Sequence, residues 1–144
     1  ESQRGYHVTI EDPGVEPRIM CFPAEAKFAI TPMAMGLRLA GTAEIAGLDA
    51  PPNYARARVL LELGRRILPG LKTAKYTEWM GHRPCTPDSL PVLGPAPRHP
   101  DLHFAFGHGH QGLLGASMTG RVIAEVVSGR PSPIDLTPFR VDRF

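Results

Sequence analysis

Two stretches decide the fold: WMGHRPCTPDSLPVLG at residues 79–94 and LHFAFGHGHQGLL at residues 102–114. The first reads as the end of a strand, with Arg83 held between His82 and a proline that restricts the backbone. The second reads as a short apolar strand, a glycine-rich turn and the first residues of a helix. We expect these two stretches to carry the chemistry of the chain.

Length and composition set the broad class. The 144 residues are 42% hydrophobic and 21% charged, which is ordinary for a soluble globular protein with one modest core. The net charge of +2 comes from scattered arginines, so no footprint for nucleic acid is visible. No apolar run reaches the length of about 18 residues that a membrane-spanning helix needs.

The start of the chain and its two cysteines are also informative. The chain starts without methionine or a signal-peptide pattern, and a strand follows at once, so we expect an excised part of a longer protein. Cys21 and Cys85 form no CxxC pair, and we expect two buried thiols in a reducing compartment rather than a zinc or redox site.

The first forty residues predict short strands at 6–10, 19–22, 27–31 and 37–40, separated by proline and glycine turns. Leu37 and Leu39 alternate with Arg38, which indicates an antiparallel sheet with one wet face.

A helix is expected after Asn53, which is its predicted N-cap, and Pro69-Gly70 ends it. Its apolar face is predicted from residues at helical spacing, which are Val59, Leu60, Leu63 and Ile67. Its other face is basic and is expected to be solvated; it holds Arg56, Arg58, Arg65 and Arg66.

The second half predicts a strand at 75–83, and its dense prolines then predict a stiff, irregular connection as far as Asp101. A strand at 102–106 and a helix at 112–128 follow, with Gly129 as the helix stop. The tail at 134–139 lacks periodicity and is expected to lie across a neighbouring element. The aromatic side chains expected in the core are Trp79, Phe104 and Phe106.

Arg83 is the first candidate for chemistry. Its guanidinium is always charged and presents a planar fork that matches a carboxylate in two parallel hydrogen bonds. Such an arginine, held by a following proline, suits a carboxylic acid substrate. The alternative is a structural ion pair with Asp88 or another acid, and the residue types alone leave both open.

The glycine-rich turn at 107–112 is the second candidate. A strand that ends in glycines before a helix gathers free backbone N–H groups and the positive end of the helix dipole at one point. Either a phosphate or a reduced flavin would suit that point. The turn does not follow the phosphate-loop spacing, and we expect that no G-x-G-x-x-G dinucleotide-binding fingerprint occurs here. His108 and His110 form an HxH pair without an adjacent third ligand, and we predict no metal site.

The combined motifs resemble a known family. Trp79-x-Gly81-x-Arg83-Pro84 with the stretch to Gly94, the turn from Phe104 to Leu113, and Thr119-Gly120-x-x-Ile123-Ala124-Glu125 look like the C-terminal part of the FAD-dependent amine and amino-acid oxidoreductases. The family includes D-amino-acid oxidases, glycine and sarcosine oxidases and D-amino-acid dehydrogenases. The ending of the chain, from Ile134 to Phe144, is most similar to the bacterial dehydrogenases.

The resemblance implies roles for these residues. Arg83 would hold the substrate carboxylate over the flavin, and His110 would face the substrate. The residues that would contact FAD are Val92, Leu93, Gly94, Gly107, His108, Gly109, His110, Gln111, Gly112 and Leu113. The reaction would move a hydride from the amine-bearing carbon to FAD, giving an imino acid that water converts to a keto acid and ammonia. The electron acceptor would be oxygen or a quinone, in the cytoplasm or at the inner membrane.

The expected fold class is α+β, and the expected boundary lies between residues 75 and 76. Residues 1–75 would be part of the substrate-binding domain, an antiparallel sheet with one helix. Residues 76–144 would form the strand, the proline-rich connection and a strand–helix segment that returns to the FAD domain. The nucleotide-binding βαβ half would be absent, so we expect the isolated chain to be inactive, to bind no FAD tightly and to self-associate.

Two alternatives stay open at this point. The chain could be a stand-alone protein-interaction module that uses its basic helix and proline-rich segment. Within the family, it could belong to a glycine or sarcosine type of amine oxidase.

Overall fold

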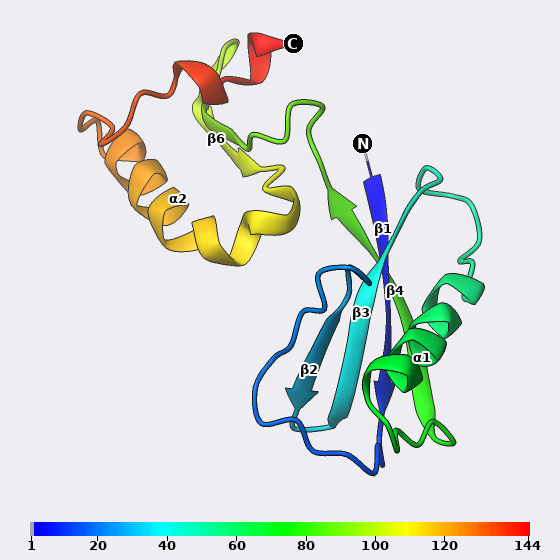
Figure 1. Cartoon of the computed structure of the whole chain (residues 1–144). Coiled ribbons are helices and arrows are strands. Elements are labelled where there is room, and N and C mark those ends of the chain that lie inside the picture. Colours follow the sequence, from blue (N-terminus) through cyan, green and yellow to red (C-terminus); the bar gives the residue numbers. More distant parts are fainter. Residues whose placement is uncertain (1) are drawn as a thin grey trace. The chain divides into compact units, whose positions relative to one another are not determined.

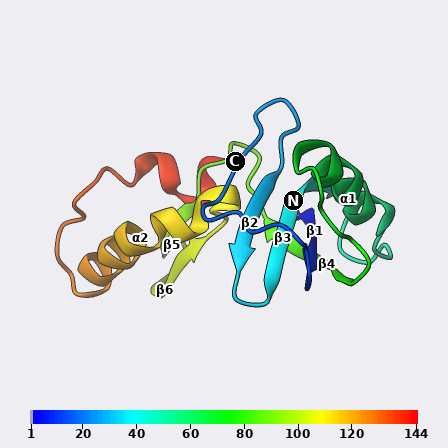
Figure 2. The same ribbon diagram turned by 60° about the horizontal axis from the view of Figure 1, so that its bottom comes forward.

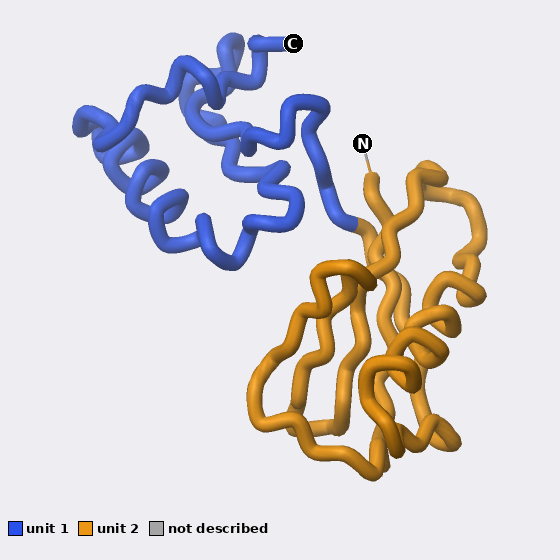
Figure 3. Tube along the Cα trace, viewed as in Figure 1, with its two compact units in different colours: residues 1, 83–144 blue, residues 2–82 orange. Residues whose placement is uncertain are grey.

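The computed structural model describes residues 2–144, which divide into two units. The N-terminal unit spans Ser2–His82, and the C-terminal unit spans Arg83–Phe144 (Figure 3). The division falls after residue 82 rather than after residue 75 because the strand at 76–84 lies beside the first strand of the chain in one sheet.

An antiparallel four-stranded sheet forms the N-terminal unit, in the order β2-β3-β1-β4 (Figure 1). Val8 of β1 and Ile30 of β2 both face Leu39 of β3 in register, so three apolar side chains line up across the sheet. The strands are β1 (Ser2–Ile10), β2 (Ala29–Met33), β3 (Gly36–Ile45) and β4 (Tyr76–Pro84).

Helix α1 (Ala55–Ile67) packs against β1 and β3 on one face of this sheet (Figures 1 and 2). The helix buries Ala57, Leu60, Leu61 and Gly64. The expected face was therefore only partly right, since Val59 and Ile67 are exposed. Gly64 allows the close approach, because a Cβ there would lie 2.7 Å from Leu39 Cδ1. The helix turns its smallest residues toward the sheet, a preference that apolar spacing alone does not reveal.

Local expectations in the N-terminal unit were corrected in two places. The strand expected at 19–22 is reduced to one isolated bridge between Cys21 and Ile30. The N-cap of α1 is Tyr54 instead of Asn53, although the Asn53 Oδ1 accepts a hydrogen bond from the Ala55 N–H. Asn53 therefore still satisfies one of the amides that a helix start leaves without a partner.

The C-terminal unit contains a two-stranded hairpin formed by β5 (Val92–Ala96) and β6 (His99–Phe106). The proline-rich connection expected up to Asp101 therefore contains a strand. Both strands of a two-stranded sheet are edge strands, the place in a sheet where proline is tolerated, so Pro95 can stand in β5.

Helix α2 (Gly112–Val127) follows the short turn η1 (Gly109–Gln111) and packs on both strands of the hairpin (Figure 2). Gly129 has a φ of +69° directly after the helix, as expected for a C-terminal stop. The tail forms two single turns, η2 (Thr137–Phe139) and η3 (Val141–Arg143), which contact β5.

Several side chains expected in the core lie at the surface. Trp79 and Phe106 are exposed, and Phe104 is half-buried. Trp79 instead stacks on the ring of His7, with 4.7 Å between ring centroids. The Cys21 thiol is exposed and that of Cys85 is half-buried, so the expectation of two buried thiols was wrong.

Within residues 2–144, neither helix is long and apolar enough to cross a membrane.

Candidate functional site

Arg83 lies near the end of β4, and Pro84 follows it. Its Nη1 atom is buried, and no residue between 2 and 144 accepts a hydrogen bond from it. No other buried side-chain nitrogen or oxygen in this described range lacks a partner. A buried guanidinium nitrogen without an acceptor is costly, so this nitrogen is free to donate to an acceptor from outside the described residues.

Asp88 does not fill this role. Its carboxylate binds the Arg143 guanidinium, with 2.6 Å from Nε to Oδ2 and 3.0 Å from Nη2 to Oδ1. The structural pair of Arg83 with Asp88, which the sequence left open, is therefore not formed. The second candidate, the glycine-rich turn at 107–112, is reached through the backbone that follows Arg83.

Backbone pairing brings the Arg83 segment to the glycine-rich turn. Cys85 forms an antiparallel bridge with His108. The methyl group of Thr86 lies against Gly107, because a Cβ at that glycine would be 2.9 Å from Thr86 Cγ2. The segment that directly follows Arg83 and the glycine-rich turn are therefore neighbours within the C-terminal unit.

The turn itself depends on glycine. Gly107 and Gly109 have φ values of +78° and +51°, a region that other residues rarely adopt. Helix α2 begins directly after η1, and the first amides of a helix have no acceptor within it. These N–H groups and the positive end of the helix dipole suit an electron-rich group.

The glycines at 107, 109 and 112 do follow the G-x-G-x-x-G spacing, so the expectation that this spacing is absent was wrong. The surrounding topology differs from a dinucleotide-binding unit. β6 pairs antiparallel with β5, and α2 is followed by the turns η2 and η3 instead of a parallel strand. The βαβ context that gives the spacing its meaning is not present in the described residues.

The two histidines of the turn have different surroundings. The His108 Nε2 lies 2.8 Å from the Thr119 hydroxyl, which ties the ring to α2. His110 and Gln111 are exposed, as is Leu113. His110 therefore remains available to a ligand, whereas His108 serves to hold the turn against the helix.

Val92, Leu93 and Gly94 lie in β5 and are buried in the C-terminal unit. Gly94 has a φ of +112° and approaches Leu136 of the tail. Any contact of these three residues with a cofactor would have to come from their backbone, and their assignment stays a prediction.

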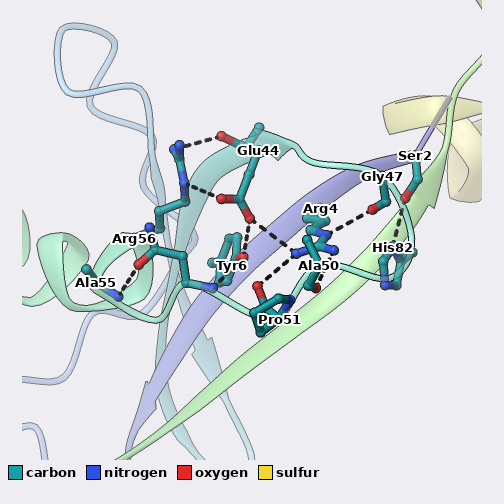
Figure 4. Close-up of polar contacts among 12 residues, drawn as sticks. Ser2, Arg4, Tyr6, Glu44, Gly47, Ala50, Pro51, Ala55, Arg56 and His82 are labelled. Atoms are coloured by element: carbon teal, nitrogen blue, oxygen red, sulfur yellow. Dashed lines mark hydrogen bonds and ion pairs between the residues drawn. The ribbon is translucent and has the colours of Figure 1, made fainter.

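A second cluster of polar residues serves as a contrast (Figure 4). Arg4 is fully buried, and its guanidinium donates to three carbonyl oxygens of the loop after β3, those of Gly47, Ala50 and Pro51. Glu44 lies 3.7 Å from Arg4 Nη1. All three nitrogens of the Arg4 guanidinium have an acceptor, so this cluster holds a loop and leaves nothing for a ligand.

The acid of this cluster is equally well satisfied. The Tyr6 hydroxyl donates to Glu44 Oε2 at 2.5 Å, and Arg56 Nε donates to Oε1 at 3.2 Å. The hydrogen bond from Tyr6 is the main cause that lowers the pKa of Glu44 below its usual range.

No group of three or more histidine, cysteine, aspartate or glutamate side chains in residues 2–144 is arranged to hold a metal ion. Sequence reasoning missed Thr86 and Arg143, which contact the turn and the loop after Arg83. Arg143 stands within the ending that carries the resemblance, but its partner 55 residues earlier leaves no local signal.

Known proteins resemble this chain over almost its full length. A D-amino-acid oxidase from Bradyrhizobium diazoefficiens is 44% identical over 100% of the chain, and a D-amino acid dehydrogenase from Paramagnetospirillum magneticum is 39% identical over 98% of it. The chain spans about a third of the length of these relatives, 35% and 34%.

A crystal structure of glycine oxidase from Geobacillus kaustophilus matches with a TM-score of 0.81 and 25% identity, over 99% of this chain and 39% of that one. The sequence profile described as DAO, FAD dependent oxidoreductase, matches residues 1–126. The chain therefore belongs to the DAO family of FAD-dependent oxidoreductases.

Proposed function

We propose that the whole protein oxidises D-amino acids, and that Arg83 binds the substrate carboxylate. The observation that carries this proposal is the buried Nη1 of Arg83, which lacks an acceptor although every other buried side-chain nitrogen or oxygen in residues 2–144 has one. A carboxylate would accept two parallel hydrogen bonds from the guanidinium. The D-amino-acid oxidase and dehydrogenase relatives support the choice of substrate class.

The glycine-rich turn fits the cofactor of the family. The positive φ values of Gly107 and Gly109 are ones that residues other than glycine rarely adopt, and the first amides of α2 lie directly after the turn. In the whole protein, the N–H groups of 107–113 would hold the isoalloxazine edge, and the backbone of 92–94 would lie near it. Bound FAD supplies the acceptor for the hydride that leaves the amine-bearing carbon.

The residues of this chain then act by position and charge. Arg83 fixes the carboxylate, and thereby the α-carbon, at one distance from the cofactor site, which lowers the entropic part of the barrier. The product is an imino acid, and water replaces its nitrogen to give a keto acid and ammonia. His110, exposed on η1, is proposed to face the substrate.

Substitution of Arg83 in the whole protein tests this role. R83A should raise the KM for D-alanine by about 100-fold or more, because one charge-assisted bidentate contact is worth about 3 kcal/mol. R83K should recover part of the loss, since lysine keeps the charge without the fork. FAD content, measured by absorbance, should stay near one per protein.

The matched control is R98A, an exposed arginine in the turn between β5 and β6. It should leave both KM and FAD content within about twofold, since exposed surface substitutions usually have little effect. Equal losses of FAD content and substrate affinity in R83A would make Arg83 structural and contradict the proposal.

A second candidate is oxidation of glycine or sarcosine, which the similarity to glycine oxidase favours. A screen of the whole protein with D-alanine, glycine and sarcosine, with and without oxygen and with a quinone acceptor, separates these activities. Turnover of none of them would favour the protein-interaction module. We place the whole protein in the cytoplasm or at the inner membrane, and fractionation of cells checks this.

A further inference from the structure

The end of the chain is tied to the loop that follows Arg83. The Arg143 side chain is only 12% exposed, although it stands next to the last residue. Besides its two bonds to Asp88, it donates from Nη2 to the Leu90 carbonyl at 2.7 Å and from Nη1 to the Arg140 carbonyl at 2.7 Å. Its hydrogen bonds to Asp88 hold the pKa of that carboxyl well below its usual range.

The loop depends on the two groups that Arg143 binds. The Thr86 hydroxyl donates to the Leu90 carbonyl at 2.7 Å, and the Leu90 N–H donates to Asp88 Oδ1 at 3.1 Å. Between them, Ser89 has a φ of +63°, a left-handed conformation that persists in a residue other than glycine only when its surroundings enforce it. Arg143 supplies part of that enforcement.

The same loop follows Arg83 closely in the chain and contacts the glycine-rich turn. Cys85, two residues after Arg83, pairs with His108 of the turn, and the Thr86 methyl group lies against Gly107. A change in the shape of 86–90 would therefore shift the backbone on the Arg83 side and the glycine-rich turn together.

We propose that Arg143 is a positioning residue of the active site, which holds the 86–90 loop through Asp88 and Leu90 and so sets the position of Arg83 and of the 107–112 turn. The proposal rests on the proposed role of Arg83 as the carboxylate-binding residue. It gives the end of the chain a role in substrate affinity, although Arg143 itself touches no substrate. A lysine at 143 would keep the charge but could not bind both oxygens of Asp88 and the Leu90 carbonyl in one plane.

The experiment compares R143K and D88N in the whole protein with the matched control R130K, which alters the pair that Arg130 forms with Glu125 near the end of α2. R143K and D88N should each raise the KM for D-alanine by about 10-fold, the equivalent of 1.4 kcal/mol, with FAD content unchanged. The double variant should lose little more than either single variant, because the two side chains act as one unit. R130K should stay within about twofold of the wild type.

Hydrogen exchange supplies a second reading that does not need turnover. Amides of 84–94 and of 107–112 should exchange faster in R143K and D88N, while those of the N-terminal unit keep their wild-type rates. Unchanged exchange in both segments, or exchange that rises throughout the chain, would overturn the proposal. So would an unchanged KM in variants that exchange faster.

The two proposals fail in different ways. If the wild type oxidises no amine, the proposed function fails in that assay, and exchange in the two segments still decides whether Arg143 holds the loop. If the wild type is active and R83A behaves as expected, an unchanged R143K overturns the positioning role alone.

Discussion

The two units of the chain differ in how they are held together. In the N-terminal unit, Val8, Ile30, Leu39 and Leu60 are fully buried between the sheet and α1. In the C-terminal unit, buried apolar side chains are few, and Val122 is the single buried residue that α2 contributes. The N-terminal unit has a core of its own, whereas the C-terminal unit relies on a hairpin, a helix and polar ties such as Asp88 to Arg143.

One arginine from each unit shows that the two units also differ in how a buried charge is hydrogen-bonded. Arg4 is buried with three carbonyl acceptors, so its charge stabilises a loop. Arg83 has a buried nitrogen without an acceptor. A fully satisfied arginine indicates a structural role, and an unsatisfied one indicates a place for a ligand, which is why we assign chemistry to the unit with the smaller core.

The largest effect on stability is expected from truncating a buried side chain in the core of the N-terminal unit. L60A should lower the free energy of unfolding by about 2–5 kcal/mol, because it removes a fully buried side chain and leaves a cavity. V122A removes less buried surface and should cost about 1–2 kcal/mol. Urea unfolding followed by the fluorescence of Trp79, the one tryptophan of the 144-residue chain, reports on the N-terminal unit.

V59A is the control for this comparison, because Val59 lies on α1 but is exposed, and it should change stability by less than about 0.5 kcal/mol. L60A should shift the Trp79 transition, and V122A should leave it in place. An equal shift in both variants would mean that the two units unfold together, which would contradict the conclusion that the N-terminal unit has a core of its own.

A smaller effect is expected at the exposed face of α2. Leu113 and Leu114 are 94% and 81% exposed at the start of the helix, and such apolar surface favours association. The purified 144-residue chain should therefore self-associate, and L113S with L114S should reduce its apparent mass in light scattering. L48S, which alters an exposed leucine of the N-terminal unit, should not. A wild-type chain that is monomeric at high concentration would contradict this expectation.

Sequence reasoning reached the fold where the signal is local. The alternation around Arg38 and the Gly129 stop are confirmed because periodicity and positive φ depend on neighbouring residues. Strand β5 was missed because Pro95 and the flanking Pro91 and Pro97 are typical of a loop, although an edge strand tolerates proline. Trp79 was placed in the core by its residue type, but it is exposed and stacks on the ring of His7.

The residues of the candidate site also divide into those that have a local signal in the sequence and those that have none. Arg83 and the 107–112 turn stand in two conspicuous motifs, so residue chemistry made them candidates, and the family resemblance gave them roles that stay predictions. The tie between Asp88 and Arg143 joins residues far apart in the chain, and no spacing rule connects them. The unsatisfied Nη1 of Arg83 is likewise a property of the folded surroundings.

The smallest expected effect is the pH dependence that His7 gives to the stability of the N-terminal unit. Burial lowers the pKa of His7 below its usual 6.5, and the positive charge of Arg38 lowers it further. Between the folded and unfolded pKa values, the unfolded chain binds a proton that the folded chain does not. Stability should therefore be full above about pH 6.5 and should decline as the pH falls below that value.

Unfolding of the wild type and of H7Q at pH 7.5 and 5.5, followed by Trp79 fluorescence, measures this contribution. The wild type should lose more stability than H7Q on acidification, because glutamine does not titrate. R38Q should diminish the loss, since it removes the cation that disfavours a charged His7. An identical pH response in all three proteins would show that the folded and unfolded chains bind a proton at His7 equally well, and would contradict this expectation.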